Sequence, residues 1–172
     1  MNLELVNHKT PILLTPTQMV DFSNPPADLE GLSQAMVTLM MKKNGLGLAS
    51  NQIGLPYSMF AMRGSPQHFV IINPRIVGTS AETVKLDEGC LTYPGLIVPI
   101  ERPRHVRLRF QTPNGETLTK QFTDISARVV QHEIQHLLGL PFWSGISREK
   151  FDIALRKCYK KGFKMDISFK KG

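Results

Sequence analysis

The stretch QHEIQHLLG at residues 131–139 carries the pattern His-Glu-x-x-His, and the interpretation of the whole chain depends on it. On an α-helix, His132 and His136 lie four residues apart, about 40° around the axis, so both rings can reach one metal ion. Glu133 then points roughly 100° to the side, next to the ion without being a ligand. A carboxylate there can take a proton from water at a metal that keeps one coordination position open. The spacing therefore predicts metal-assisted hydrolysis.

A purely structural helix is the alternative, because short motifs occur by chance and a lone histidine on an apolar helix is more often structural than a ligand. The segment 127–130 before the motif, with Ile134, Leu137 and Leu138 within it, makes most of the helix apolar. A buried helix that carries two histidines and a glutamate must satisfy three polar groups, and a metal ion does so. We therefore favour a catalytic metal.

A third ligand must come from elsewhere, because a catalytic metal usually has three protein ligands. No histidine follows His136, and the downstream candidates are carboxylates. Upstream, Cys90 lies in DEGCLT at residues 87–92, where glycine leaves room for a close approach and a thiolate is a strong ligand. A buried, inert thiol is the alternative for a lone cysteine. Together with the helix, Cys90 is expected to be a ligand and not to pair with Cys158.

Length and composition limit the class of protein. At 172 residues the chain is long enough for one well-packed domain and short for two. Its 41% hydrophobic and 20% charged residues are ordinary for a soluble globular protein. No run approaches the roughly 18 apolar residues of a membrane span, and polar residues and proline interrupt the N-terminal segment. We expect a cytoplasmic protein, whose reducing compartment argues against a disulfide.

Local patterns predict the elements around the motif. Apolar residues at helical spacing predict a helix from about Asp28 to Lys43, which Asn44-Gly45 would end. Residues 1–25 read as irregular, and GLGLASNQ at 45–52 is a small-residue segment where backbone can approach a ligand. Short β-branched or alternating runs predict strands at Met59–Met62, His68–Ile72, Leu96–Val98, Val106–Phe110 and Thr117–Phe122.

The turn signal TPNG at 112–115 predicts a hairpin between the last two strands, and Asp124 or Ser126 could cap the motif helix. The fold class is α+β: short antiparallel strands around a central His-Glu-x-x-His helix, with an N-terminal helix and a basic C-terminal helix. We expect residues 1–172 to be a single catalytic domain, with 147–172 as a basic C-terminal extension of it.

The C-terminal segment holds nearly all of the excess positive charge. From residue 148 onward there are nine basic residues and three acids, so this segment contributes +6 of the net +7. The basic residues are Arg148, Lys150, Arg156, Lys157, Lys160, Lys161, Lys164, Lys170 and Lys171. Ser147 could cap a helix here, and the alternation from Phe163 to Phe169 predicts a short strand. A solvated face on a docked helix is the alternative for such a charge run.

Three separated segments resemble the peptide deformylase family: GLGLASNQ at 45–52, EGCLT at 88–92 and QHEIQH at 131–136. Matching residues around 72–74 and 93–95 extend the resemblance to residues 10–145. The family removes the formyl group from N-formylmethionyl nascent peptides, using one divalent metal ion per chain held by one Cys and two His. The resemblance implies Fe(II) as the native ion, for which Zn, Ni or Co may substitute.

The resemblance also implies a role for individual residues. The metal ligands would be Cys90, His132 and His136, and the general base that then protonates the leaving amine would be Glu133. The Gln52 side chain and the Leu91 amide would stabilise the oxyanion. The Gly47 backbone would pair with the peptide as a strand does. Arg102 matches a family arginine near the peptide channel, although a solvated surface charge is equally plausible. From the residues themselves, Val129 and Leu91 are candidates for an apolar methionine pocket, with core packing as the alternative.

The sequence departs from the family pattern at Leu14, Ser50, Thr92 and Gln135, where the family usually has Arg or His, Ala, Ser and Asp. Only Gln135 removes a charge next to a proposed ligand, His136. The charges around the metal site would therefore differ from those in the family. Such divergence suits a distant bacterial enzyme or a phage-encoded one, so the expected compartment is the bacterial cytoplasm or the cytoplasm of a phage host.

Partners follow from the same resemblance. The family's substrate emerges from the ribosome and some members dock there through a C-terminal helix, so we expect the basic C-terminal segment to bind ribosomes, the protein to be a monomer, and no membrane to be involved. A metallopeptidase is a second possible function, against which the cysteine and the glutamine loop argue. A basic RNA-binding protein with a structural metal is a third, but a structural zinc would need four protein ligands.

Overall fold

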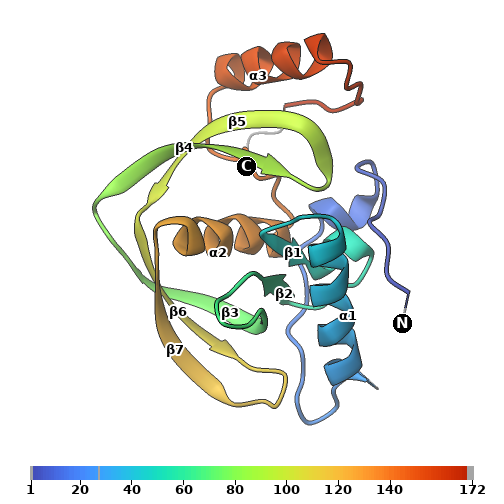
Figure 1. Cartoon of the computed structure of the whole chain (residues 1–172), viewed down its shortest axis with the longest axis vertical. Helices are drawn as coiled ribbons and strands as arrows, with labels where there is room; N and C mark the ends of the chain where they lie inside the picture. Colours follow the sequence, from blue (N-terminus) through green and yellow to red (C-terminus); the bar gives the residue numbers. More distant parts are fainter. Residues whose placement is uncertain (1, 27, 170–172) are drawn as a thin grey trace.

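The β-branched and alternating runs in the middle of the chain pair into antiparallel sheets, and helices pack against them (Figure 1). The computed structural model describes residues 2–26 and 28–169. Within these residues the elements are η1 (Pro11–Leu14), α1 (Leu29–Lys42), β1 (Gly47–Ala49), η2 (Ser50–Ile53), β2 (Met59–Met62), β3 (Phe69–Thr79), β4 (Thr83–Cys90), β5 (Tyr93–Pro103), β6 (His105–Gln111), β7 (Thr117–Thr123), α2 (Asp124–Leu137) and α3 (Arg148–Lys160). The expected α+β class is confirmed.

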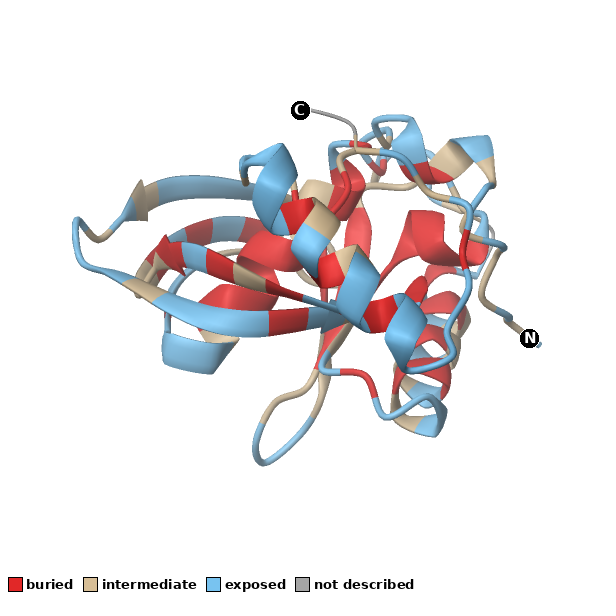
Figure 2. Ribbon diagram, turned by 90° about the horizontal axis from the view of Figure 1, so that it is seen from above, coloured by how far each residue is buried: buried red, intermediate tan, exposed pale blue. Residues whose placement is uncertain are grey.

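Helix α2 lies in the middle of the molecule, between a five-stranded sheet of order β1-β2-β3-β6-β7 and the separate β4–β5 hairpin (Figure 1). Alternation along β2 divides the apolar residues between the two faces of the larger sheet: Met59 and Ala61 pack with α1, whereas Phe60 and Met62 pack with α2. On its other side the hairpin is covered by α3, which turns exposed residues outward and buried positions inward (Figure 2). The His-Glu-x-x-His helix is therefore central, as expected.

The predicted helices form where apolar spacing and capping residues agree. The Asp28 carboxylate accepts a hydrogen bond from the Gly31 N–H at 2.8 Å to start α1, and Asn44 ends it with a φ of 55°. The N-cap of α2 is Thr123 rather than Asp124 or Ser126. Ser126 still contributes, because its Oγ accepts the Thr123 N–H at 3.1 Å.

Strands differ more from the prediction. β3 does not stop at Ile72 but continues through Asn73-Pro74, because Asn73 adopts a φ of 51° in a bulge and pairing resumes at Arg75. β4 was not predicted at all. Most of its residues are exposed, so it carries no apolar alternation, and its pairing with β5 depends on backbone hydrogen bonds.

The strand predicted after Gly162 is wrong, since residues 163–169 form no strand in the described chain. Their alternation instead reflects packing of an extended segment, in which Met165, Ile167 and Phe169 contact the cluster under α3. Lys170 and Lys171 of the basic run lie outside the described residues. Among the residues that are described, no helix combines the length and the apolar character that a membrane span requires.

Candidate active site

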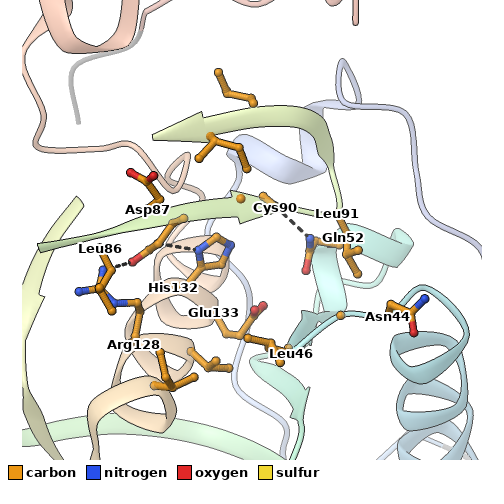
Figure 3. Close-up of a pocket in the computed structure, with 18 of the residues that line it drawn as sticks. Asn44, Leu46, Gln52, Leu86, Asp87, Cys90, Leu91, Arg128, His132 and Glu133 are labelled. Carbon is orange, nitrogen blue, oxygen red and sulfur yellow. Dashed lines mark hydrogen bonds and ion pairs between the residues drawn. The ribbon is translucent and has the colours of Figure 1, made fainter. Parts of the chain in front are cut away.

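Two distant elements bring three ligand-type side chains together. Cys90 ends β4, and His132 and His136 lie one turn apart on α2. The Cys90 Sγ is 3.1 Å from the His136 Nε2, and ligand atoms of all three residues lie within 4.8 Å of one another. Figure 3 shows Cys90 next to the His132 ring at the wall of a cleft. The structure therefore brings together the three residues that the sequence selected.

The tip of the β4–β5 hairpin positions the cysteine. Cys90 pairs with Tyr93, so Leu91 and Thr92 form a two-residue turn. Behind this turn the register shifts, because β5 has extra residues between Tyr93 and Val98. Bulges of this kind bend a strand, and this one carries the hairpin tip over α2.

The three residues fit a divalent metal ion. Burial lowers the pKa of His136 well below its usual value, and burial also lowers the pKa of His132, so both rings are neutral and can bind an ion. Burial, with the nearby Glu133 charge, raises the pKa of the Cys90 thiol to about 12. The thiol therefore needs a cation beside it to become a thiolate. One thiolate and two imidazoles suit a transition metal and leave a coordination position open.

The ring of His132 is oriented by a buried carboxylate, because its Nδ1 lies 3.0 Å from the Glu88 Oε2. Burial raises the pKa of Glu88, but hydrogen bonds from Arg102 and His132 outweigh it and hold this pKa at about 2. An ionised carboxylate only accepts, so Nδ1 carries the proton and Nε2 is left for an ion.

Two arginines hold that carboxylate. Arg102 donates from Nε and Nη2 to the two Glu88 oxygens at 2.6 and 2.8 Å, and Arg128 donates from Nη1 to Oε1 at 2.6 Å. Arg102 is only 6% exposed, so its interpretation as a solvated surface charge is wrong. It does not line the cleft either, and instead lies behind Glu88. Gln135 Oε1 accepts from Arg102 at 2.8 Å, so the amide keeps the contact without the charge of an aspartate.

Sequence reasoning missed the roles of Glu88 and Arg128. The available signal was the position of Arg128, four residues before His132 and eight before His136 on the same row of α2. An arginine in line with two buried histidines requires a buried acceptor, and Glu88 in the second family segment supplies it.

Glu133 occupies the cleft side of α2 (Figure 3). It is 4% exposed, and among the described residues its Oε2 is buried without a hydrogen-bond partner. Burial raises its pKa to about 8, and the charge of Glu88 adds to this effect. A buried carboxyl group with an unused oxygen and a displaced pKa, located in a cleft, is a candidate for proton transfer.

The carboxamide of Gln52 has a fixed orientation. Its Oε1 accepts the Ala49 N–H at 2.8 Å, while its Nε2 donates to the Thr92 Oγ1 at 3.0 Å and lies 3.5 Å from the Cys90 Sγ. The N–H₂ group therefore faces the cysteine (Figure 3). Thr92 keeps the hydroxyl that serine provides in the family, so this departure preserves the contact.

A cleft of about 420 Å³ opens beside these groups. Gly47, Leu91 and Val129 all contribute to its lining, together with the exposed side chains Leu46, Leu86, Ile97 and Ile125. Gly47 belongs to β1, which forms one edge of the five-stranded sheet. An edge strand can pair with an incoming extended chain.

Gly47→Ala is expected to lower kcat/KM at least tenfold without unfolding the protein. A Cβ on Gly47 would lie 2.4 Å from the Glu133 Oε1, so the carboxylate or the edge strand must move, and misplacement of a reacting group by 1 Å can cost 10²-fold. Steady-state kinetics with thermal unfolding checks this. Gly78→Ala is the matched control, since a Cβ there meets no atom closer than 3.7 Å. Equal kinetics of both variants would contradict the proposed crowding.

Comparison with known proteins identifies what this arrangement resembles. Residues 2–152 match the family model described as Polypeptide deformylase. The peptide deformylase of Borreliella burgdorferi is 34% identical over 142 residues, which cover 81% of this chain and 85% of that protein. The peptide deformylase of Aquifex aeolicus is 33% identical over 163 residues, covering 91% and 95%. The crystal structure of a peptide deformylase from Synechococcus elongatus in complex with actinonin has a TM-score of 0.83 at 29% identity, covering 94% of this chain and 87% of that one.

Proposed function

This chain belongs to the peptide deformylase family, and from that premise we propose how its residues remove the formyl group from N-formylmethionyl nascent peptides. The observation that carries the proposal is the meeting of Cys90, His132 and His136 beside Glu133, whose Oε2 has no hydrogen-bond partner among the described residues. Family membership decides against a metallopeptidase as the main activity.

Cys90, His132 and His136 would hold one divalent metal ion, which when bound supplies a Lewis acid that polarises the formyl carbonyl and makes water more acidic. Glu133 takes a proton from the attacking water and then delivers it to the leaving amine, so one residue serves as base and acid in turn. The departing products are formate and a peptide with a free amino terminus.

The oxyanion that develops on the formyl group needs donors that are already oriented. Gln52 Nε2 is held by the contacts of its own Oε1, and the Leu91 N–H lies in the hairpin turn beside Cys90. Each such donor contributes about 2.7–4 kcal/mol to transition-state stabilisation in a dry site. The substrate backbone would pair with β1 at Gly47, and its methionine would occupy the apolar lining at Val129 and Leu91. Arg102 would act as a positioning residue through Glu88 and His132.

The function and the metal are tested together by formate release from formyl-Met-Ala-Ser. We infer Fe(II) as the native ion from the family resemblance, and the Cys/His/His donor set also suits Zn, Ni or Co as substitutes. Protein loaded anaerobically with Fe(II) should release formate and should lose this activity in air. Protein loaded with Ni or Co should keep its activity in air. Acetyl-Met-Ala-Ser should react at least tenfold more slowly, because an extra methyl overpacks a tight site. No formate from any loaded form would reject the function, and an Fe(II) form indifferent to air would favour zinc.

Residues 1–172 would act as one catalytic domain, monomeric and cytoplasmic, in a bacterium or in the host of a phage. The basic extension 147–172 would bring it to the ribosome, from which the substrate emerges. Helix α3 supports this, because Arg156 and Lys160 are exposed and lie roughly opposite its buried positions 151, 154 and 158 at 100° per residue.

Ribosome binding should weaken steeply with salt, since each neutralised phosphate lowers log K by about 0.7–0.9 per tenfold rise in salt. Reversing the charges of Arg156 and Lys160 to Glu should abolish co-sedimentation with ribosomes, while deformylation of a free tripeptide stays within twofold of the parent protein. Reversal of Lys42 and Lys43, at the end of α1, is the control. Unchanged co-sedimentation would return α3 to a structural role.

A further inference from the structure

A second hollow, of about 360 Å³, lies between the β4–β5 hairpin and α3. Its charged lining consists of four lysines and one aspartate: Lys85, Lys150, Lys157, Lys161 and Asp87. The formal charge of this lining is +3. We call this hollow the lysine groove. Its volume is within the range of ligand sites, about 300–1,000 Å³.

The lysines are arranged around the groove and not scattered over α3. Lys150 and Lys157 belong to α3 and Lys161 is its C-cap. They are separated by seven and four residues, so they form one row within about 40° of one another. Lys85 belongs to β4, on the opposite wall. None of the four takes part in an ion pair within residues 2–26 and 28–169. Their uncompensated charge creates a positive potential in a recess, which attracts anions.

The lysine groove adjoins the active-site cleft across the β4–β5 hairpin. Asp87, Gly95 and Ile97 line both hollows, and the Ile97 side chain is 44% exposed at the boundary. Figure 3 shows Asp87 pointing away from Glu133. A peptide that fills the cleft can therefore continue over the hairpin into the groove, and an extended chain advances about 3.3 Å per residue.

Resting on the proposed function, we propose that the lysine groove binds acidic side chains of the substrate peptide, a few residues downstream of the formylmethionine. The three lining residues shared with the cleft favour the substrate over ribosomal RNA as the occupant. The exposed Arg156 and Lys160 are better placed for RNA, because 100° per residue puts them roughly opposite the buried positions 151, 154 and 158 of α3. Asp87 opposes an acidic ligand at the entrance, so the preference should begin beyond it. The enzyme would deformylate nascent chains with early Asp or Glu faster than neutral ones.

A positional scan tests this. Formyl-Met peptides ten residues long, built from Ala and Ser, carry a Glu-Glu pair moved stepwise from position 3 to position 9, and a Gln-Gln pair in the matched series. At low ionic strength kcat/KM should favour Glu-Glu about fivefold to twentyfold at one or two positions only, as expected for a few partly exposed ion pairs. The preference should fade as salt shortens the screening length. A preference equal at all positions would overturn the groove as its cause.

Two variants that remove the same number of charges separate the groove from overall charge. Lys85→Gln, Lys150→Gln, Lys157→Gln and Lys161→Gln together should reduce the Glu-Glu preference to below twofold and leave kcat/KM for formyl-Met-Ala-Ser within twofold. Arg148→Gln, Arg156→Gln, Lys160→Gln and Lys164→Gln together should keep the preference. Equal loss in both variants, or no loss in the groove variant, would overturn the proposal.

Binding is measured separately from catalysis, so that failure of the enzymatic function is not confused with failure of the groove. Fluorescence anisotropy reports the binding of a fluorescein-labelled Met peptide that lacks the formyl group. The peptide carries Glu-Glu at the preferred position. If no formate is released in the scan, each scanned position is tested in turn. The groove variant should bind it at least fivefold more weakly than the control variant does, at low salt. Equal affinities of the two variants would overturn the groove proposal. The proposal would also fail if the groove variant lost co-sedimentation with ribosomes but kept its preference for Glu-Glu peptides.

Discussion

Replacing Glu133 by Gln is expected to lower kcat for formyl-Met-Ala-Ser about 10²- to 10⁴-fold, the usual contribution of a positioned general base. The amide has the same size as the carboxyl group but cannot take a proton from water. Because the three ligand residues are unchanged, metal content should stay near one ion per chain. Activity and metal analysis of the same sample check both statements.

Stability should not fall with this substitution. Burial raises the pKa of Glu133 to about 8, so the folded protein gains nothing from its charge, and its Oε2 has no partner among the described residues. Glu149→Gln on the exposed start of α3 is the matched control and should leave kcat unchanged. Loss of the metal together with the rate would make Glu133 a structural residue and contradict its role as the base.

Replacing Glu88 by Gln should lower the free energy of unfolding by about 3–5 kcal/mol, the cost of removing one partner from a buried ion pair. Arg102 and Arg128 would both keep their buried charges without a counterion. His132 would lose the acceptor that orients its ring, so metal affinity should fall about 10- to 100-fold. Denaturant unfolding and a competitive metal titration measure the two effects.

The exposed ion pair between Glu82 and Arg104 provides the control for this experiment. Its side chains are 57% and 42% exposed, so Glu82→Gln should cost at most about 1 kcal/mol. Adding Arg128→Leu to Glu88→Gln should restore part of the stability, because one unpaired guanidinium is removed. If Glu88→Gln unfolds like the parent protein, the buried network does not stabilise this fold.

The sequence predicts well what depends on local spacing. Helical periodicity locates α1 and α2, and the His-Glu-x-x-His pattern with the DEGCLT segment selects the three ligand-type residues that the fold brings together. It predicts poorly what depends on tertiary pairing. Glu88 and Arg128 are 40 residues apart. The place of Arg128 in line with the two histidines predicts a buried acceptor, but local spacing does not identify that acceptor as Glu88. β4 escapes prediction for the same reason, since its partner strand, not its own side chains, makes it a strand.

Alternation can also mislead when the contact partner is unknown. Residues 163–169 alternate like a strand, yet their apolar side chains pack under α3 without sheet pairing. Arg102 shows that the burial of a charged residue is equally hard to predict. An arginine in a polar stretch is expected to be exposed, but here it is buried because it pairs with Glu88 on the neighbouring strand. Both errors come from contacts that sequence spacing does not encode.

The division of the ligands between two layers has a further consequence for the life of the protein in a cell. Cys90 lies at the tip of the β4–β5 hairpin, which packs with α3. His132 and His136 belong to α2, which packs on the larger sheet, and His136 is 46 residues away from Cys90 in the sequence. An ion bound by all three would act as a cross-link between the layers, adding about 2.7 kcal/mol when its free concentration is 100 times Kd. In a newly made chain that has not yet bound an ion, the two layers would separate more often, and proteases would cut the chain sooner. Metal supply would then govern how long each copy survives.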